Sequence, residues 1–328
     1  MKIDPGHGEI REQQRGHVVV GPGDDVVGVA VVHQPRPGDH GDRPHVGQIS
    51  GGARIVEAMD EQRYDVWASG AAYDRYMGRW SRAVAREFTA WLGCPDGLRW
   101  LDVGCGTGVL SAVVRERCRP RLVVGCDRSD GFVRAARAAV VADAMALPVR
   151  DGAFDVAVSG LTLNFLPDPA AAVAGMARAV RPGGAQVAAY VWDYAQGMGL
   201  LRLFWDTAAA LDPAAAELDE GRRFPGCRPQ PLHDLWTAAG LADVVVRPIE
   251  VPTVFTDFAD LWGPFLAGQG PAPGYVTALP PAGRDELRET LRAAAPTAPD
   301  GTIPLSARAW AVRGRTARPG TVPNSPRV

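Results

Sequence analysis

The chain has 328 residues, of which 46% are hydrophobic and 22% are charged, and its formal net charge is -2. This length and composition suit one large folded core or two modest ones, and they exclude a fibre, a repeat array and a wholly disordered chain. The small net charge gives no electrostatic reason to expect nucleic acid or a membrane surface as a partner.

The five cysteines form no Cys-x-x-Cys pair, so the sequence predicts neither a zinc site nor a redox couple. We therefore expect reduced thiols and no metal. No apolar run reaches the roughly 18 residues that a membrane-spanning helix needs. The N-terminus also lacks the apolar segment of a signal peptide. These patterns predict a cytoplasmic protein that does not interact with membranes.

Residues 1–57 are rich in glycine, proline and valine and show no helical period. We expect a disordered extension, or sequence upstream of a true start at Met59. A metal-binding extension is the alternative, because five of the six histidines fall here, but their spacing is irregular and no cysteine accompanies them. A second disordered segment is expected at residues 317–328.

The sequence changes character at residue 58, and we expect one domain over residues 58–316. Aromatic and aliphatic residues recur every three or four positions between Glu61 and Leu92, which predicts amphipathic helices over residues 58–92. Short apolar runs then alternate with helical stretches over residues 98–192. Strands are expected at 99–103, 121–126, 139–142, 154–159 and 185–191, and helices at 108–118, 130–138 and 169–180.

Buried strands joined by helical crossovers indicate a parallel sheet with helices on both faces. After Trp192 the pattern becomes mainly helical, and residues 193–300 are expected to form helices and loops on the substrate side. Here we expect helices at 200–211, 231–239, 257–266 and 284–294, and strands at 243–251 and 303–312. The glycine- and proline-rich stretch 263–275 is expected to be an irregular loop.

The segment WLDVGCGTGVL, residues 100–110, combines a buried strand with three glycines at alternate positions. In an open parallel sheet, ligands bind where the first strand turns into its helix, so Asp102, Gly104, Gly106 and Gly108 are candidates for a binding loop. The G-x-G-x-G spacing differs from the G-x-G-x-x-G of dinucleotide sites. A purely structural turn is the alternative.

Carboxylates follow the next two predicted strands. Asp127 ends the second strand, about 20 residues on, where a carboxylate can accept hydrogen bonds from two ribose hydroxyls. Asp143 and Ala144 end the third strand, where a carboxylate and a backbone amide can recognise the amine and ring edge of adenine. Together these residues predict a site for an adenosine-containing cofactor.

The ordered set LDVGCGTG, Cys126-Asp127, Asp143-Ala144, FDVAVS and RPGG resembles the class I S-adenosylmethionine-dependent methyltransferases. It is most similar to the branch of ubiquinone/menaquinone-type and other small-molecule methyltransferases, and the likeness spans about residues 64–190. The resemblance implies an α/β fold: a Rossmann-like three-layer sandwich with a seven-stranded, mostly parallel sheet and an antiparallel last strand. It also implies S-adenosyl-L-methionine as cofactor and a small-molecule methyl acceptor.

The same resemblance implies roles for individual residues around the cofactor. Asp102, Gly104 and Gly106 would surround the methionine part, Asp127 the ribose, Asp143 and Ala144 the adenine, and Ser159 the far side of the pocket. Arg128, the neighbour of Asp127, is also expected to bind the cofactor. The segment YDRYMGRWSR, residues 73–82, is similar to the helix that covers the cofactor in this branch. Tyr76 would then contact the ligand and Arg79 its carboxylate; an amphipathic helix with an exposed arginine is the equal alternative.

No catalytic residue is assigned, because methyl transfer from a sulfonium needs mainly alignment and exclusion of water. His233, Asp193 and Tyr194 are the candidates if an acceptor must lose a proton, and a surface or orienting role is their alternative. Nucleic-acid signatures are missing: SGLTLNF replaces the N/D-P-P-Y-type motif after the fourth strand, and Cys105 is expected to be filler.

Six aromatic residues could line an apolar acceptor pocket or belong to the ordinary core: Trp192, Trp205, Phe224, Trp262, Phe265 and Tyr275. Three functional hypotheses remain. The first is a small-molecule methyltransferase. The second is a catalytically silent module that binds the cofactor and serves partner interaction. The third is a nicotinamide-dependent oxidoreductase, which the glycine spacing disfavours.

Overall fold

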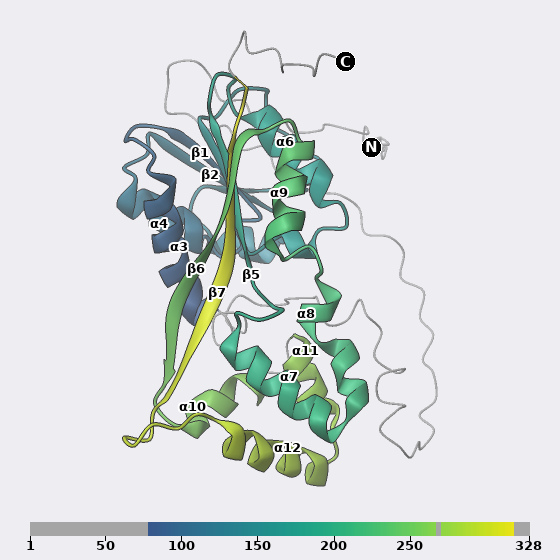
Figure 1. Ribbon diagram of the computed structural model, residues 1–328. Coiled ribbons are helices and arrows are strands. Elements are labelled where there is room, and N and C mark those ends of the chain that lie inside the picture. The colour runs from purple at the N-terminus through teal and green to yellow at the C-terminus, as the bar shows by residue number, and fades with distance from the viewer. Residues whose placement is uncertain (1–77, 267–269, 318–328) are drawn as a thin grey trace, which may run out of the picture.

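A seven-stranded sheet lies at the centre of the described part of the chain (Figure 1). The computed structural model describes residues 78–266 and 270–317. The strands are β1 (Arg99–Val103), β2 (Leu122–Asp127), β3 (Ala139–Val141), β4 (Val156–Gly160), β5 (Gln186–Trp192), β6 (Ala242–Phe255) and β7 (Ile303–Arg315). Their order is β3-β2-β1-β4-β5-β7-β6. The parallel strands β1 to β5 and the antiparallel last strand, β7, confirm the predicted Rossmann-like sheet.

Helices cover both faces of this sheet (Figure 1). On one face lie α3 (Arg79–Leu92) and α4 (Val109–Arg117), and on the other lie α6 (Pro169–Ala179) and α9 (Pro229–Ala238). The short helix α5 (Asp130–Ala135) packs against β2 and β3. The three layers place every turn from a parallel strand into its following segment at one edge of the sheet, which is the edge that binds ligands in such folds.

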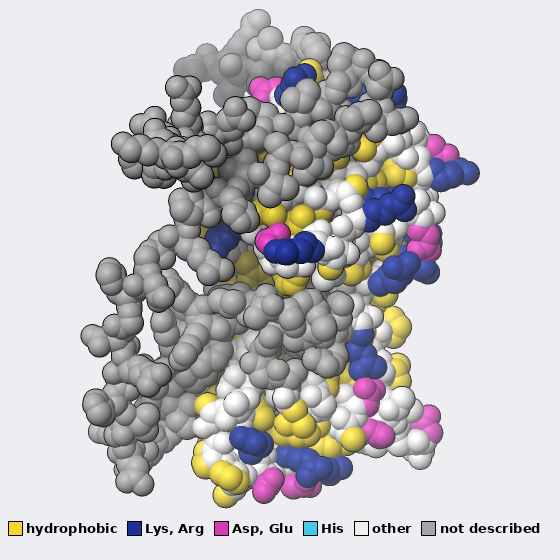
Figure 2. All heavy atoms as spheres, turned by 180° about the vertical axis from the view of Figure 1, so that it is seen from behind, with side chains coloured by type: hydrophobic (Ala, Val, Ile, Leu, Met, Phe, Trp, Pro, Cys, Tyr) yellow, Lys and Arg dark blue, Asp and Glu magenta, His cyan; other side chains and the backbone are white. Residues whose placement is uncertain are grey.

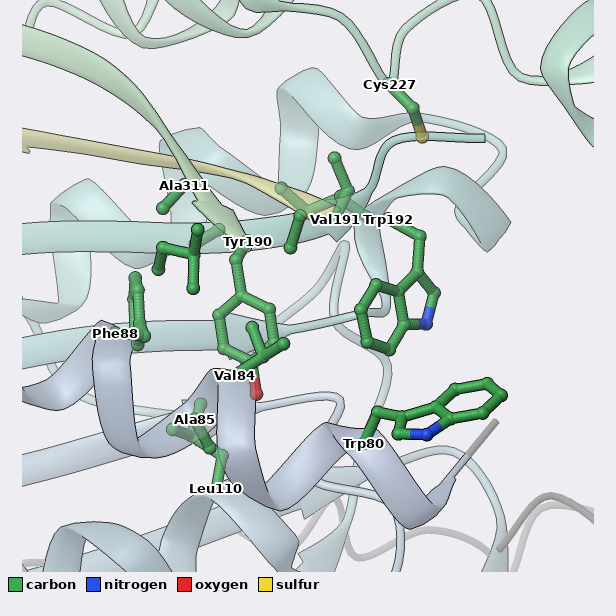
Figure 3. Packing of buried hydrophobic residues seen from close by; sticks show 14 of the residues in the cluster. Trp80, Val84, Ala85, Phe88, Leu110, Tyr190, Val191, Trp192, Cys227 and Ala311 are labelled. Carbon is green, nitrogen blue, oxygen red and sulfur yellow. The ribbon is translucent and has the colours of Figure 1, made fainter. Parts of the chain in front are cut away.

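The pattern of apolar residues explains why α3 lies flat on the sheet. Trp80, Val84, Phe88 and Leu92 recur every four residues and are all buried, so one face of the helix is apolar. Phe88 meets Tyr190 of β5 with ring centroids 4.7 Å apart (Figure 3). The helix stops at Gly93, which adopts the left-handed conformation common after a helix end.

The strands show two burial patterns. All seven residues of β5 are buried, as expected of a central strand with helices on both faces. Towards its end, β6 instead alternates buried Ile249, Val251, Thr253 and Phe255 with exposed neighbours. The prediction ended this strand at residue 251, but pairing with β7 continues to Phe255 opposite Ile303. Likewise β7 continues to Arg315, which pairs with Gln186.

A group of helices surrounds the far ends of β6 and β7 (Figure 1). It comprises α7 (Gly199–Leu211), α8 (Glu220–Arg223), α10 (Phe258–Trp262), α11 (Pro271–Ala278) and α12 (Pro281–Ala294), with 3-10 turns at Pro213–Leu218 and Gly263–Leu266. The expected irregular loop at 263–275 is therefore wrong for most of its length. Proline is tolerated in the first helical turn, where no intrahelical donor is needed, so Pro271 begins α11 instead of preventing it.

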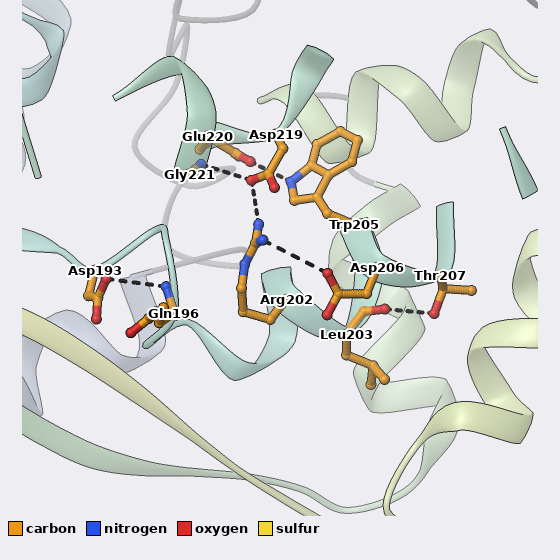
Figure 4. Close-up of polar contacts among 10 residues, drawn as sticks. All are labelled: Asp193, Gln196, Arg202, Leu203, Trp205, Asp206, Thr207, Asp219, Glu220 and Gly221. Carbon is orange, nitrogen blue, oxygen red and sulfur yellow. Dashed lines mark hydrogen bonds and ion pairs between the residues drawn. The ribbon is translucent and has the colours of Figure 1, made fainter. Parts of the chain in front are cut away.

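Buried polar side chains hold α7 against α8 (Figure 4). Arg202 forms an ion pair with Asp219, and Trp205 Nε1 donates to Glu220 Oε2 at 2.5 Å. Burial raises the pKa of the Glu220 carboxyl to about 7. Most of the predicted aromatic pocket belongs to the core: Trp192, Trp205, Trp262, Phe265 and Tyr275 are each at most 6% exposed.

Candidate functional site

The glycine loop after β1 needs residues without a side chain. Gly104, Gly106 and Gly108 have φ of 71°, 51° and 88°, in the left-handed region that favours glycine. The amides of Gly104 and Cys105 both donate to the carbonyl of Cys126, at 2.8 and 2.9 Å, which ties the loop to the end of β2. The loop leads directly into α4, whose N-terminus lies behind it.

The turn after β1 passes so close to the turn after β4 that only glycine fits at position 104. A Cβ at this position would lie 2.2 Å from the Thr162 Cγ2 atom. The Thr162 Oγ1 lies 2.9 Å from the Gly104 carbonyl oxygen and 3.1 Å from the Gly160 carbonyl oxygen, so its single hydroxyl proton is shared between these two acceptors. The turn after β1 is therefore fastened to the turn after β4.

Gly106 faces open space, because a Cβ built there meets no atom within 4 Å. It lines a cavity of about 620 Å³ at the carboxyl ends of β1, β2, β3 and β4. This volume falls within the roughly 300–1,000 Å³ of small-molecule sites. The lining includes seven predicted residues: Asp102, Gly104, Gly106, Asp127, Arg128, Asp143 and Ala144.

Asp127 is positioned by two backbone amides. Its Oδ2 accepts from the Gly106 amide at 2.9 Å, and its Oδ1 accepts from the Ser129 amide at 2.8 Å. These bonds fix the half-buried carboxylate at the end of β2 and couple it to the glycine loop. Each carboxylate oxygen can accept a second hydrogen bond, so the group can still receive a pair of adjacent hydroxyls.

Asp143 lies in the next turn, beyond β3. Its Oδ1 accepts from the Met145 amide at 2.9 Å, which orients the carboxylate beside the buried Ala144. Both residues line the cavity. A carboxylate with free acceptor capacity suits an exocyclic amine, as on adenine.

Asp102 is the most buried carboxyl group of the cavity, at 1% exposed. Its Oδ2 accepts from the Ser111 hydroxyl at 2.7 Å, whereas its Oδ1 has no hydrogen-bond partner among the described residues. Loss of hydration on burial raises the pKa of Asp102 to about 6. An ammonium group bound next to Oδ1 would satisfy this oxygen and favour the ionised carboxylate.

Cys105 lies within the loop and also lines the cavity. Burial raises the pKa of its thiol far above the ordinary value, so the reactive thiolate is not formed near neutral pH. Its sulfur packs closely over Gly125, where a Cβ would lie 2.8 Å from Sγ. This environment suits a packing role and not a nucleophile.

Two predicted site residues of the described part of the chain, Arg79 and Ser159, do not line the cavity. Arg79 donates to Asp260 at 2.9 Å, and its guanidinium carbon lies 5.2 Å from the ring centroid of Phe255. Ser159 is fully buried within β4, and its hydroxyl has no hydrogen-bond partner in the described structure. Tyr76, together with half of the segment predicted to cover the cofactor, lies outside the described residues.

Several lining residues were not predicted: Ser81, Thr107, Ser129, Phe132, Met145, Thr162 and Phe165. Most of these residues lie close in sequence to predicted ones. A prediction that included every residue of the turn after each strand would have found them. Ser81 was included in the covering segment but received no role. No sequence pattern pointed to Thr162, because its contact with Gly104 joins residues 58 positions apart.

The proposed proton acceptors do not line the cavity. His233 lies on the exposed side of α9 beside Asp234. The buried Asp193 carboxylate forms an ion pair with Arg308, with 2.6 Å between Oδ2 and Nη2. This contact agrees with the alternative prediction that Asp193 orients the loop after β5. Within residues 78–266 and 270–317, no cluster of His, Cys, Asp or Glu side chains could hold a metal ion. None of the described helices is long and apolar enough to span a membrane.

Comparisons with known proteins agree with this geometry. Residues 101–188 match the family described as methyltransferase domain. The chain is 35% identical over 124 residues to the mouse tRNA (carboxymethyluridine(34)-5-O)-methyltransferase ALKBH8, covering 36% of this chain and only 17% of that protein. It is 26% identical over 219 residues to demethylmenaquinone methyltransferase of Geobacillus stearothermophilus, covering 60% of this chain and 90% of that one.

Among solved structures, one similar chain is Haemonchus contortus phosphoethanolamine N-methyltransferase 2 in complex with phosphomonomethylethanolamine and S-adenosylhomocysteine. It is 15% identical, with a TM-score of 0.47, and the match covers 82% of this chain and 61% of that one.

Residues 101–188, which match a methyltransferase domain, include the glycine loop and the carboxylates Asp102, Asp127 and Asp143 of the cavity, and S-adenosylmethionine is the cofactor that this match implies. The cavity fits this cofactor on its own chemistry. It offers an unpartnered buried carboxylate oxygen at Asp102, an open glycine wall at Gly106 and an oriented carboxylate at Asp127. These features suit an ammonium group, a close backbone approach and a ribose diol, respectively.

Proposed function

We propose that this protein transfers the methyl group of S-adenosylmethionine to a small molecule. The proposal depends mainly on one observation: a single cavity joins the glycine loop to the carboxylates of Asp102, Asp127 and Asp143. Within the class, we propose the branch of ubiquinone/menaquinone-type and other small-molecule enzymes. The match over 90% of the Geobacillus demethylmenaquinone methyltransferase supports this branch.

When bound, S-adenosylmethionine supplies a methyl group activated by a positively charged sulfur. The residues of the chain would then contribute binding and alignment. Asp127 and Asp143 would fix the two ends of the nucleoside, and Asp102 would hold the amino group of the methionine part. Positive charge disappears in the transfer, so holding the reactants in line and excluding water can supply most of the acceleration.

A small acceptor is favoured over a nucleic acid by the distribution of charge. On the face shown in Figure 2, the described arginine side chains lie apart, several beside acidic ones, and form no continuous basic stripe where the side chains are described. Proteins that follow a phosphate backbone need such a stripe. The ALKBH8 match nevertheless makes transfer RNA the alternative acceptor to test.

The cofactor site is tested by isothermal titration calorimetry with S-adenosylmethionine and, separately, with NADH. Wild type should bind the first with micromolar affinity and not the second, and Asp127→Ala should weaken binding at least tenfold. Asp285→Ala is the matched control, because Asp285 is an exposed residue of α12 that does not line the cavity. Binding of NADH alone would favour the oxidoreductase hypothesis and contradict the proposal.

The acceptor class is tested with S-adenosylmethionine that carries a radioactive methyl group. The purified protein is incubated with a cell extract separated into a low-molecular-weight fraction and an RNA fraction. We expect label in the low-molecular-weight fraction. Label that remains with RNA and is released by ribonuclease would support a transfer RNA acceptor. Cofactor that binds in both mixtures without being consumed would support the silent binding module.

A further inference from the structure

A second cavity of about 330 Å³ lies next to the cofactor cavity. The two meet at Leu166, which lines both. Leu163 and Asn164 line the second cavity, whereas Phe165, the next residue, lines the first, so the 3-10 turn Leu163–Phe165 after β4 separates them. The opposite wall comes from the segment after α8 and from α9.

The lining of this second cavity is mostly apolar, and two of its side chains carry nitrogen donors. The residues are Leu163, Asn164, Leu166, Pro169, Val191, Arg223, Phe224, Pro225, Gly226, Cys227, Pro231, Leu232 and Leu235. An apolar cavity with a few polar groups is the usual composition of a site for a small organic molecule.

Asn164 is the unusual residue of this cavity. Its Oδ1 and Nδ2 are both shielded from solvent, and neither has a hydrogen-bond partner in the described structure. Buried polar side-chain atoms in folded proteins nearly always have a partner. Asn164 therefore carries an unpartnered donor and an unpartnered acceptor at a residue that lines the cavity, and both atoms would reach a ligand once the side chain turns toward it.

The primary amide of Asn164 specifies what it can recognise. It presents one acceptor oxygen beside one donor nitrogen, so its complement is a ligand edge with a donor beside an acceptor. Arg223 adds a guanidinium to the same lining, which favours oxygen over nitrogen as the accepting atom. The apolar walls require the rest of the ligand to be hydrophobic.

An aromatic contact spans the boundary between the two cavities. Phe224 of the second cavity packs edge to face against Phe165 of the first, with ring centroids 5.5 Å apart. A flat molecule in the second cavity would have one end against Leu166, the residue that also lines the cofactor cavity. The opposite end would lie toward Leu232 and Leu235 of α9.

We propose that this second cavity is the acceptor subsite of the enzyme. It takes a small, largely apolar molecule whose polar edge carries a donor beside an oxygen acceptor, and Asn164 is the residue that selects this edge. The inference rests on the proposed methyltransferase function and adds the chemical class of its acceptor.

Two probe molecules of nearly equal shape test whether Asn164 selects a ligand edge with a donor beside an oxygen acceptor. 2-Naphthamide carries a donor beside an oxygen acceptor, whereas 2-acetylnaphthalene replaces the donor with a methyl group. Both are titrated into the protein alone and into protein saturated with S-adenosylhomocysteine. We expect the amide to bind about tenfold more tightly than the ketone, as one added hydrogen bond to a buried partner allows. Saturation with S-adenosylhomocysteine should not prevent this binding.

The variant Asn164→Leu should remove the preference, leaving the two probes with equal affinity. Gln230→Leu is the matched control: it changes an exposed amide of α9, which donates to Asp234 at 2.7 Å, and should leave the preference unchanged. The melting temperature of Asn164→Leu without ligand should equal or exceed that of wild type, because no hydrogen bond is lost. A purely structural Asn164 would give a lower melting temperature.

Three results would overturn the proposal: no binding of the amide, competition between the amide and S-adenosylhomocysteine, or an unchanged preference in Asn164→Leu. Titration with S-adenosylmethionine shows whether a negative result contradicts the acceptor subsite or the proposed function. Normal cofactor binding with failure of the probes would contradict the acceptor subsite alone. Selective probe binding without any cofactor binding would contradict the methyltransferase function, and with it the acceptor role of the second cavity, and would leave only a small-molecule site that depends on Asn164.

Discussion

The Thr162 hydroxyl donates a hydrogen bond to the Gly104 carbonyl oxygen at 2.9 Å, and this bond joins the turn after β4 to the glycine loop after β1. Both residues line the cofactor cavity. The glycine loop is therefore held from the side on which the second cavity lies. Its conformation depends on a residue outside the loop itself.

Thr162→Val keeps the shape of the side chain and removes the donor. We expect a loss of about 1 kcal/mol in the free energy of unfolding, because one partly buried hydrogen bond is lost. The dissociation constant of S-adenosylmethionine should rise about fivefold, measured by calorimetry. Thr290→Val is the control, since its hydroxyl donates to the Glu286 carbonyl on exposed α12. Equal affinities in all three proteins would show that the bond does not hold the loop.

Alanine substitutions at two glycines distinguish an effect of backbone strain on stability from a direct effect on cofactor binding. Gly97 and Gly106 both have positive φ, and a Cβ at either position would meet no atom within 4 Å. Alanine at each should therefore cost a similar 1–2 kcal/mol or so of stability, because of the left-handed conformation. Only Gly106 lines the cavity, so only Gly106→Ala should abolish S-adenosylmethionine binding. Loss of binding in Gly97→Ala as well would mean that general destabilisation is responsible.

Arg79 was predicted to contact the carboxylate of the cofactor or, alternatively, to be an exposed residue of an amphipathic helix. In the structure it pairs with Asp260, and both side chains are partly exposed, at 36% and 28%. Such pairs contribute roughly 0–1 kcal/mol. We expect Arg79→Ala and Asp260→Ala to lower the melting temperature slightly and equally, with unchanged S-adenosylmethionine affinity. Weaker cofactor binding in Arg79→Ala alone would restore its predicted role.

The elements between residues 99 and 192 could be predicted because their signal is local. Each strand there is a short apolar run, and each following turn carries its own glycine or carboxylate, as at Gly106 and Asp127. The contacts that could not be predicted join residues far apart in the sequence. The contact of Thr162 with Gly104 and that of Arg79 with Asp260 join residues 58 and 181 positions apart. No spacing pattern reports them.

The region after Trp192 was harder to predict for a different reason. Proline and glycine usually interrupt regular structure, so 263–275 was expected to be a loop. In the structure Pro271 opens α11, and Ala272, Tyr275 and Val276 of that helix are buried. Packing of these side chains stabilises a helix that local propensity alone would not predict. The second cavity and the unpartnered amide of Asn164 likewise follow from tertiary packing.

In the absence of a ligand, the buried carboxyl group of Asp102 should lower the free energy of unfolding of the protein at neutral pH relative to acidic pH. Its pKa is raised by burial from 3.8 to about 6, so the native state holds the proton to a higher pH than the unfolded chain does. Its contribution to stability is full below pH 3.8 or so and is lost as the pH rises through about 6. A shift of about two units corresponds to at most about 3 kcal/mol.

Asp102→Asn removes this titration and keeps an oxygen that can accept from Ser111. In urea titrations the variant should match wild type near pH 4 and be more stable by up to about 3 kcal/mol near pH 8. Binding should change in the opposite direction, because only an ionised Asp102 attracts an ammonium group. Wild type should bind S-adenosylmethionine more tightly at pH 7 than at pH 5, whereas the variant should bind weakly at both. A variant that is less stable at pH 8, or that keeps the pH dependence of binding, would mean that the buried carboxylate is maintained for packing and not for the cofactor.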